Sequence, residues 1–214
     1  MDITLDAAVK VIKPLIPMDE KELKGILRKH KKFLNKEEGG KYAVLASRDL
    51  SDMDLSGADL RFANLAGANL KKAQLEGANL SHCNLTEADL SHADLTKANC
   101  TAANFFGADL LSACFDGADC SKSVFKGNLM WDCSFEGAVI KGADFEKALL
   151  CDSNFTKANL SGANLSQANL DKAWFIEADL SEANLRDAKN TYWADFKGAD
   201  LSGANTTGCK FSEE

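Results

Sequence analysis

The chain has 214 residues, enough for one or two ordinary domains with a sizeable core. Hydrophobic residues make up 45% of it, which excludes an intrinsically disordered chain. The net charge of −7 disfavours direct nucleic-acid binding, because phosphates require a basic surface. No apolar run approaches the roughly 18 residues of a membrane helix, and the first residues do not resemble an export signal. We therefore expect a cytoplasmic protein without a membrane span.

Residues 1–47 differ from the rest and are predicted to form a small helical N-terminal cap. A short helix is expected over Leu5–Lys13, and a second begins at Asp19-Glu20 and continues to Leu34. Gly39-Gly40 is expected to end that second helix. His30 is interpreted as part of the cap, because a lone histidine lacks the partners that a metal site needs.

An alternative for this segment uses its charge. Residues 1–47 hold ten basic and seven acidic side chains, whereas residues 48–214 hold 15 and 25. The basic helix could contact an acidic partner, although charged outer faces are usual for helices of this kind. The cations concerned are Lys21, Lys24, Arg28, Lys29, Lys31 and Lys32.

A five-residue repeat dominates the chain from Leu50 to Leu185. Of the 28 positions spaced by five, 24 are Leu or Phe, and Ala stands two residues before 21 of them. Asp or Asn usually lies between these two columns, which gives the unit A-(D/N)-L-x-x. Neither the 3.6 period of a helix nor the 2.0 period of a strand has this spacing. Each unit is therefore predicted to be one side of a coil in a solenoid.

The motif resembles that of the pentapeptide-repeat proteins, over about residues 48 to 212. The resemblance implies an all-β solenoid, a right-handed quadrilateral β-helix with 20 residues per coil and about eight coils. The short helical lead is similar to the lead of many bacterial members. The resemblance to the family also implies that the central Leu/Phe and the small residue two before it point inward. At about 4.8 Å per coil the rod would be about 40 Å long.

Twenty-residue intervals place phenylalanines on two opposed faces of the middle coils. Close packing then requires smaller residues elsewhere, which explains Cys100 and Cys120 as core residues. Cys83, Cys133 and Cys209 replace inward alanines and receive the same interpretation. The seven cysteines are expected to be reduced thiols rather than a disulfide framework.

The register slips by one residue near positions 186–195, so the repeat domain, residues 48–214, has an irregular C-terminal end. A bare last coil would expose unpaired backbone and favour self-association. Tyr192 and Trp193 are predicted either to fold over this end or to join a homodimer contact, together with Phe211.

Little in the sequence points to catalysis, and we expect no enzyme, cofactor or metal. No common catalytic or nucleotide-binding motif is present, and no Cys/His spacing fits zinc. His82 and His92 are predicted on opposite faces, out of reach of each other. An enzyme remains an alternative only through the outward thiols Cys114 and Cys151.

Outward positions become apolar over three successive coils in the middle of the repeat. Such a contiguous patch with a tryptophan predicts a protein–protein interaction surface, although a local packing irregularity is an equal alternative. The partner is unknown. The residues are Phe106, Leu111, Leu129, Trp131, Leu149 and Cys151. Trp174 and Ile176 form a smaller pair elsewhere.

The alternative function follows from the acidic outer column. Family members that protect DNA gyrase from quinolones are thought to imitate a DNA duplex, and an acidic rod could occupy a basic saddle of a topoisomerase. Candidate positions are Asp49, Asp89 and Asp109. The long loops of many such members are missing here, and interspersed lysines dilute the charge.

Overall fold

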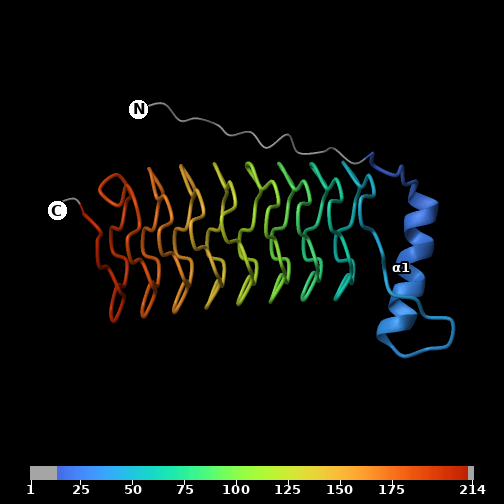
Figure 1. Cartoon of the computed structure of the whole chain (residues 1–214). Helices are drawn as coiled ribbons and strands as arrows, with labels where there is room; N and C mark the ends of the chain where they lie inside the picture. The colour runs from blue at the N-terminus through green and yellow to red at the C-terminus, as the bar shows by residue number, and fades with distance from the viewer. Residues whose placement is uncertain (1–13, 212–214) are drawn as a thin grey trace.

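The computed structural model describes residues 14–211, which form a solenoid β-helix with one helix, α1, at its N-terminal end (Figure 1). The coils stack into an elongated rod, and α1 lies across the end opposite the C-terminal coil. The helix predicted over Leu5–Lys13 lies outside the described residues.

Helix α1 spans Glu20–Leu34 and confirms the predicted second helix. Asp19 caps it, since its Oδ1 accepts a hydrogen bond from the backbone N–H of Glu22 at 2.7 Å. The helix ends at Leu34, as predicted, and Asn35 is its C-cap, so the expectation that Gly39-Gly40 would end it is wrong. Gly40 serves a close approach instead: a Cβ there would lie 2.4 Å from the backbone nitrogen of Phe33.

The repeat region holds no continuous strand within residues 14–211. Its coils are joined by single-residue parallel bridges at intervals of 20, such as those joining Asn64 to Asn84 and Asp89 to Asp109. Around most bridges the backbone bonds are regular: Leu65 N–H donates to the carbonyl of Asn84 at 2.8 Å, and Asn64 N–H donates to that of Ala43 at 3.0 Å. The main-chain hydrogen bonds therefore run along the rod axis, from coil to coil.

The Asp/Asn column adds a second, local set of hydrogen bonds at the corners. Asn64 Oδ1 accepts from Ala66 N–H at 3.1 Å, and Asp89 Oδ1 accepts from Ser91 N–H at 2.9 Å. This side-chain turn explains why Asp and Asn share the column: both supply the acceptor, whatever their charge.

Each corner also needs a residue in the left-handed region. Glycine provides it at Gly57 and Gly77, both with φ +63°. Lysine, histidine and glutamate adopt the same conformation at other corners, for example Lys72 at +57° and His82 at +58°. The uniform hydrogen-bonding frame thus imposes this conformation on residues that ordinarily avoid it.

The central residues form a continuous buried core along the rod axis. Phenylalanines stack along each of two opposed faces and meet edge to face across the centre, where the Phe115 and Phe125 ring centroids lie 5.9 Å apart. Cys100 and Cys120 are fully buried, as the volume argument predicted. Leu23 is the residue of α1 that is buried in this core.

Near the C-terminal end the bridge interval changes from 20 to 21. Lys189 still pairs with Asn169, but the next bridge joins Trp174 to Asp195. The extra residue is accommodated in a turn in which Trp193 N–H donates to the carbonyl of Asn190 at 3.0 Å. A corner absorbs the insertion, so the faces beyond it regain their alignment.

Candidate functional site

The predicted apolar residues lie together on one side of the middle coils, the green to yellow part of Figure 1. Leu129 bridges Leu149 on the next coil, and Asp109 on the preceding one. A parallel column holds Leu111, Trp131 and Cys151, because Ser112 N–H donates to Trp131 O and Asp132 N–H donates to Cys151 O. We call Phe106, Leu111, Leu129, Trp131, Leu149 and Cys151 the Trp131 patch.

The Trp131 patch is most exposed at its centre. Leu129 is 60% exposed and Trp131 54%, and Phe106 at the adjoining corner is also 54% exposed. Leu149 and Cys151 are half-buried, so they form the edge of the patch rather than fully outward positions. A contiguous set of large apolar side chains of this kind is typical of a contact surface.

The backbone beneath the patch departs from the regular frame at Asn128, a buried residue where alanine is usual. Asn128 Nδ2 donates to the carbonyl of Phe105 at 2.7 Å, and Asn128 Oδ1 accepts from Gly107 N–H at 2.8 Å. At another corner the equivalent Gly117 N–H is bonded to the backbone carbonyl of Glu136. The Asn128 side chain therefore replaces a coil-to-coil bond of the main chain.

The patch also lacks two of the corner hydrogen bonds that the Asp/Asn column forms elsewhere. Asp109 Oδ1 accepts from Leu111 N–H at 3.2 Å, but leucine at 129 and 149 supplies no acceptor for the following corner. Two leucines thus stand where the repeat ordinarily forms a local hydrogen bond. Their side chains do not belong to the buried core, so burial does not compensate for the lost bond.

The charges around the patch differ between its two edges. At one edge Lys126 pairs with Glu146 at 2.5 Å, and Lys147 lies 3.3 Å from the same carboxylate. Asp132 and Asp152 stand in one column along the other edge. The patch is therefore apolar in its middle and acidic along one side.

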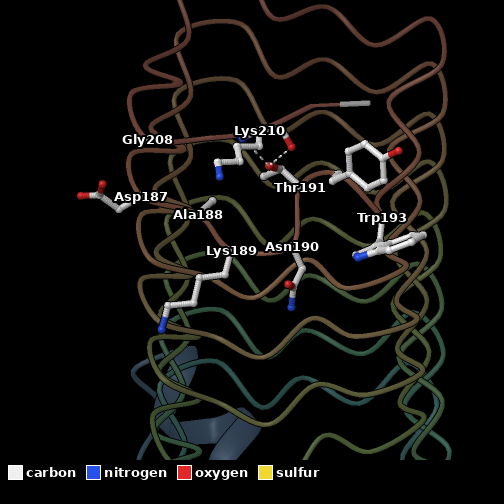
Figure 2. A pocket seen from close by; sticks show the side chains of 9 residues that line it. Asp187, Ala188, Lys189, Asn190, Thr191, Trp193, Gly208 and Lys210 are labelled. Atoms are coloured by element: carbon white, nitrogen blue, oxygen red, sulfur yellow. Dashed lines mark hydrogen bonds between the residues drawn. The ribbon is translucent and has the colours of Figure 1, made fainter. Parts of the chain in front are cut away.

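The predicted self-association residues lie at the C-terminal end, where the register slip opens a cavity of about 390 Å³ (Figure 2). Tyr192 and Trp193 are 52% and 65% exposed and contact each other edge to face at 5.1 Å. Figure 2 shows Thr191 bonded to the backbone of Lys210, with Oγ1 donating to its carbonyl at 2.6 Å.

A second cavity of about 800 Å³ lies beside it, where Trp193 adjoins the half-buried Phe196, Leu201 and Phe211. The last coil thus leaves apolar core residues partly open. Trp174 is 51% exposed on the neighbouring face, and Ile176 is half-buried.

The three candidate acidic positions are not equivalent. Asp109 is exposed, whereas Asp49 and Asp89 are half-buried. Asp49 Oδ1 accepts from Asn69 Nδ2 at 2.9 Å, and Asp89 Oδ1 accepts from Ser91 Oγ at 2.7 Å. Their carboxylates are therefore partly occupied by the fold's own hydrogen bonds.

The seven cysteines are free thiols. Burial raises the pKa of Cys83 and of Cys133 to about 12. Burial, followed by Asp171 and Asp152, raises the pKa of Cys151, which opposes formation of a thiolate there. Cys114 is half-buried, with its Sγ 3.4 Å from Thr96 Oγ1.

Inward polar residues form a pattern that the sequence analysis missed. Ser123 Oγ, Cys133 Sγ and Ser153 Oγ each contact a backbone carbonyl 23 residues earlier, at 2.6, 2.9 and 2.6 Å. Their position two before the central residue was the available signal, because a side-chain donor there can reach a backbone carbonyl of the preceding coil.

Across residues 14–211, His, Cys, Asp and Glu side chains form no cluster suited to a metal ion. In the same part of the chain, no helix is both long and apolar enough to cross a membrane.

Comparison with protein-family models matches the pentapeptide repeats model to residues 49–82, 83–121, 118–156, 153–189 and 192–213. Curated protein sequences give no match. Among solved structures, one similar protein is HetL from the cyanobacterium Nostoc sp. strain PCC 7120, described as involved in heterocyst differentiation regulation. It is 26% identical with a TM-score of 0.34, over 88% of this chain and 95% of that chain.

A pentapeptide repeat protein from the Arabidopsis thaliana thylakoid lumen is 30% identical, with a TM-score of 0.37, over 49% of this chain and 69% of its own. Full-length QnrB1, described as a plasmid-mediated fluoroquinolone resistance protein, is 16% identical with a TM-score of 0.45. That alignment covers 81% of this chain and 93% of the other.

Proposed function

Since the chain belongs to the pentapeptide repeat family, we propose that it acts as a rigid, non-enzymatic protein–protein interaction module whose partner binds the Trp131 patch. Members of this family typically serve as structural or interaction modules. The solenoid fold suits this role because its coils hold surface side chains on a stiff, regular frame.

One observation carries the proposal: the apolar residues of the patch are contiguous over three coils, and two of them, Leu129 and Leu149, replace residues that would bond the corners. Leu129 and Trp131 are more than half exposed and contribute little to the core. Aromatic side chains, tryptophan among them, at the centre of a patch are frequent sources of binding energy at protein interfaces.

The test changes the patch without changing the frame. Leu129→Asp and Trp131→Lys in one chain should abolish retention of a specific partner from a cell extract and binding of that partner once purified. Circular dichroism should remain that of the wild-type chain, and the unfolding midpoint should not fall. A matched control, Trp174→Lys, changes an equally exposed tryptophan outside the patch. Equal loss of binding in the control would contradict the assignment of the patch.

A second candidate is an acidic DNA mimic that binds a type II topoisomerase such as gyrase and protects it from quinolones. The support is electrostatic: residues 48–214 carry a net charge of −10, and Asp109 is exposed within the acidic column. Inhibition of gyrase supercoiling, measured with and without a quinolone, tests it. Salt-sensitive inhibition that is lost on Asp89→Asn and Asp109→Asn would favour the mimic, and no effect at micromolar protein would oppose it.

The architecture that accompanies this proposal is a right-handed, four-sided rod of about eight coils, residues 48–214, capped by residues 1–47. The 20-residue bridge interval and the position of α1 support it. The open apolar residues of the last coil support a homodimer contact there, in which Tyr192, Trp193 and Phe211 would take part.

A further inference from the structure

The ring of His30 joins α1 to the repeat region by two hydrogen bonds and is completely buried. Its Nδ1 accepts from the backbone N–H of Ala43 at 3.1 Å. Its Nε2 lies 3.1 Å from the backbone carbonyl of Arg61, which can only accept, so Nε2 carries the proton. The bonded ring is therefore the neutral tautomer with Nδ1 unprotonated.

We propose that His30 is an acid-sensitive latch that holds the C-terminal half of α1 on the first coils at neutral pH and releases it in mild acid. A proton on Nδ1 would place two N–H donors face to face, and the bond to Ala43 would be lost. If the ring stayed docked, its positive charge would also be buried, and burial disfavours a charged ring.

The surroundings of the ring decide the direction of the effect. From the repeat region it faces Asp59 and Arg61, whose opposite charges pair with each other through two hydrogen bonds of 2.8 and 2.7 Å. From α1 it faces Phe33, and from the connecting segment Tyr42, with ring centroids 6.1 Å away in both cases. Burial, the largest influence, lowers the pKa of His30 below its ordinary 6.5, although the Arg61 carbonyl and Asp59 act in the opposite direction.

The sign follows from proton linkage. The docked state binds fewer protons than the undocked state between the lowered pKa and the ordinary value. Docking is therefore strongest above pH 6.5 and weakens as the pH falls toward the lowered value. Below the lowered pKa, the contribution of His30 to docking is completely lost, and a further fall in pH weakens docking no more.

The release is confined because the N-terminal half of α1 has attachments of its own to the repeat region. Leu23 is buried in the core, and Glu22 forms an ion pair with Arg48 of the first coil. By contrast, Lys41 N–H donates to the carbonyl of Lys29 at 3.0 Å, so this bond belongs to the same half as the latch. Release would uncover the edge of the first coil at Ala43.

Amide hydrogen exchange by NMR on the full chain tests the latch, with the amides of Ala43 and Lys41 as reporters. After correction for the intrinsic exchange rate, their protection should fall between pH 7.5 and 5.0. The fall should be about tenfold for each pH unit that separates the two pKa values of His30. The Leu65 amide, which is bonded within the coils, is the internal reference and should not change.

His30→Gln keeps a donor and an acceptor without a titrating ring, and should make the protection independent of pH. His82→Gln, at an exposed histidine, is the matched control and should behave as the wild type. Glu22→Gln removes the carboxylate of the ion pair and so shows whether that group contributes to the pH dependence of protection. An unchanged pH dependence in His30→Gln would overturn the proposal, as would wild-type protection that is flat from pH 7.5 to 5.0. If His30→Gln fails to fold, ring chemical shifts of wild-type His30 decide: protonation without loss of Ala43 protection also overturns it.

Discussion

Phe115 and Phe135 stack with their rings parallel to within 1° and their centroids 4.6 Å apart. The two residues occupy the same position on successive coils, so the separation of the rings matches the distance from one coil to the next. The packing of the core and the hydrogen bonding of the backbone therefore have a common spacing along the rod.

Phe135→Ala should lower the free energy of unfolding by about 3–5 kcal/mol, because the cavity would lie between stacked rings that cannot collapse into it. The rings above and below belong to Phe115 and Phe155. Phe135→Leu should cost less, since leucine fills the same position at Leu95. Urea denaturation of the full chain measures both, and equal costs for the two variants would contradict this account of the core.

Ser123→Ala should change the free energy of unfolding by less than about 1 kcal/mol. Ser123 Oγ donates to the carbonyl of Cys100, but that carbonyl also accepts from Ala103 N–H at 2.9 Å and would keep a partner. Ser123→Leu should be worse by about 1–3 kcal/mol, because it overpacks a closed position. Denaturation midpoints compare the two, and a large loss in the alanine variant would show that the buried hydroxyl is essential.

Leu129→Asn should stabilise the fold by about 0.5–1 kcal/mol, because the amide oxygen would accept from the N–H of Trp131 as Asp109 does from Leu111. Thermal unfolding measures the effect. A gain in stability would favour a binding surface over a packing irregularity, because leucine would then be the less stable choice for the free protein. A loss of more than about 1 kcal/mol would mean that the exposed leucine packs productively in the free protein.

The buried thiols should resist modification at pH 8, because burial raises the pKa of Cys83 and Cys133 to about 12. Ellman's reagent should react first with the half-buried Cys114, Cys151 and Cys209, and with all seven only after unfolding. Cys114→Ser and Cys151→Ser identify the signals. A rate at Cys151 above that of free cysteine would revive the enzyme alternative.

Trp193→Asp should lower the sedimentation coefficient if the C-terminal coil forms the proposed dimer, since a carboxylate would be buried without a partner in the contact. Trp131→Asp on the middle coils is the control for a general effect of charge. Analytical ultracentrifugation over a hundredfold range of concentration makes the comparison. A wild-type chain that remains monomeric throughout would exclude the dimer.

The sequence was sufficient for the period, the inward columns and the phenylalanine faces, because each of these repeats and chance cannot sustain it. Cys100 and Cys120 were placed correctly by volume alone. Single departures from the repeat were harder. The Asn128 side chain takes the place of a coil-to-coil backbone bond, so its direction depends on a local change in the backbone. No five-residue pattern encodes that change.

Residues outside the repeat were the least predictable. Helix α1 ends at Leu34, as the apolar spacing predicted, but its cap is Asn35, whose N–H bonds to the Lys31 carbonyl, rather than the glycines that follow. Phe33 fits the apolar spacing of the helix, yet it is 44% exposed and packs beside Tyr42. The burial of His30 arises from contacts 13 and 31 residues away, which helical periodicity cannot reveal.

The 20-residue bridge interval separates the length of the molecule from the direction in which its side chains point. Removing residues 141–160 would shorten the rod by one coil, about 4.8 Å, and leave each remaining side chain on its own face. Removing ten would instead transfer the C-terminal half to the opposite side. A chain of this kind can therefore act as a graduated ruler, in which the spacing between two binding surfaces changes in fixed steps while their orientation is preserved.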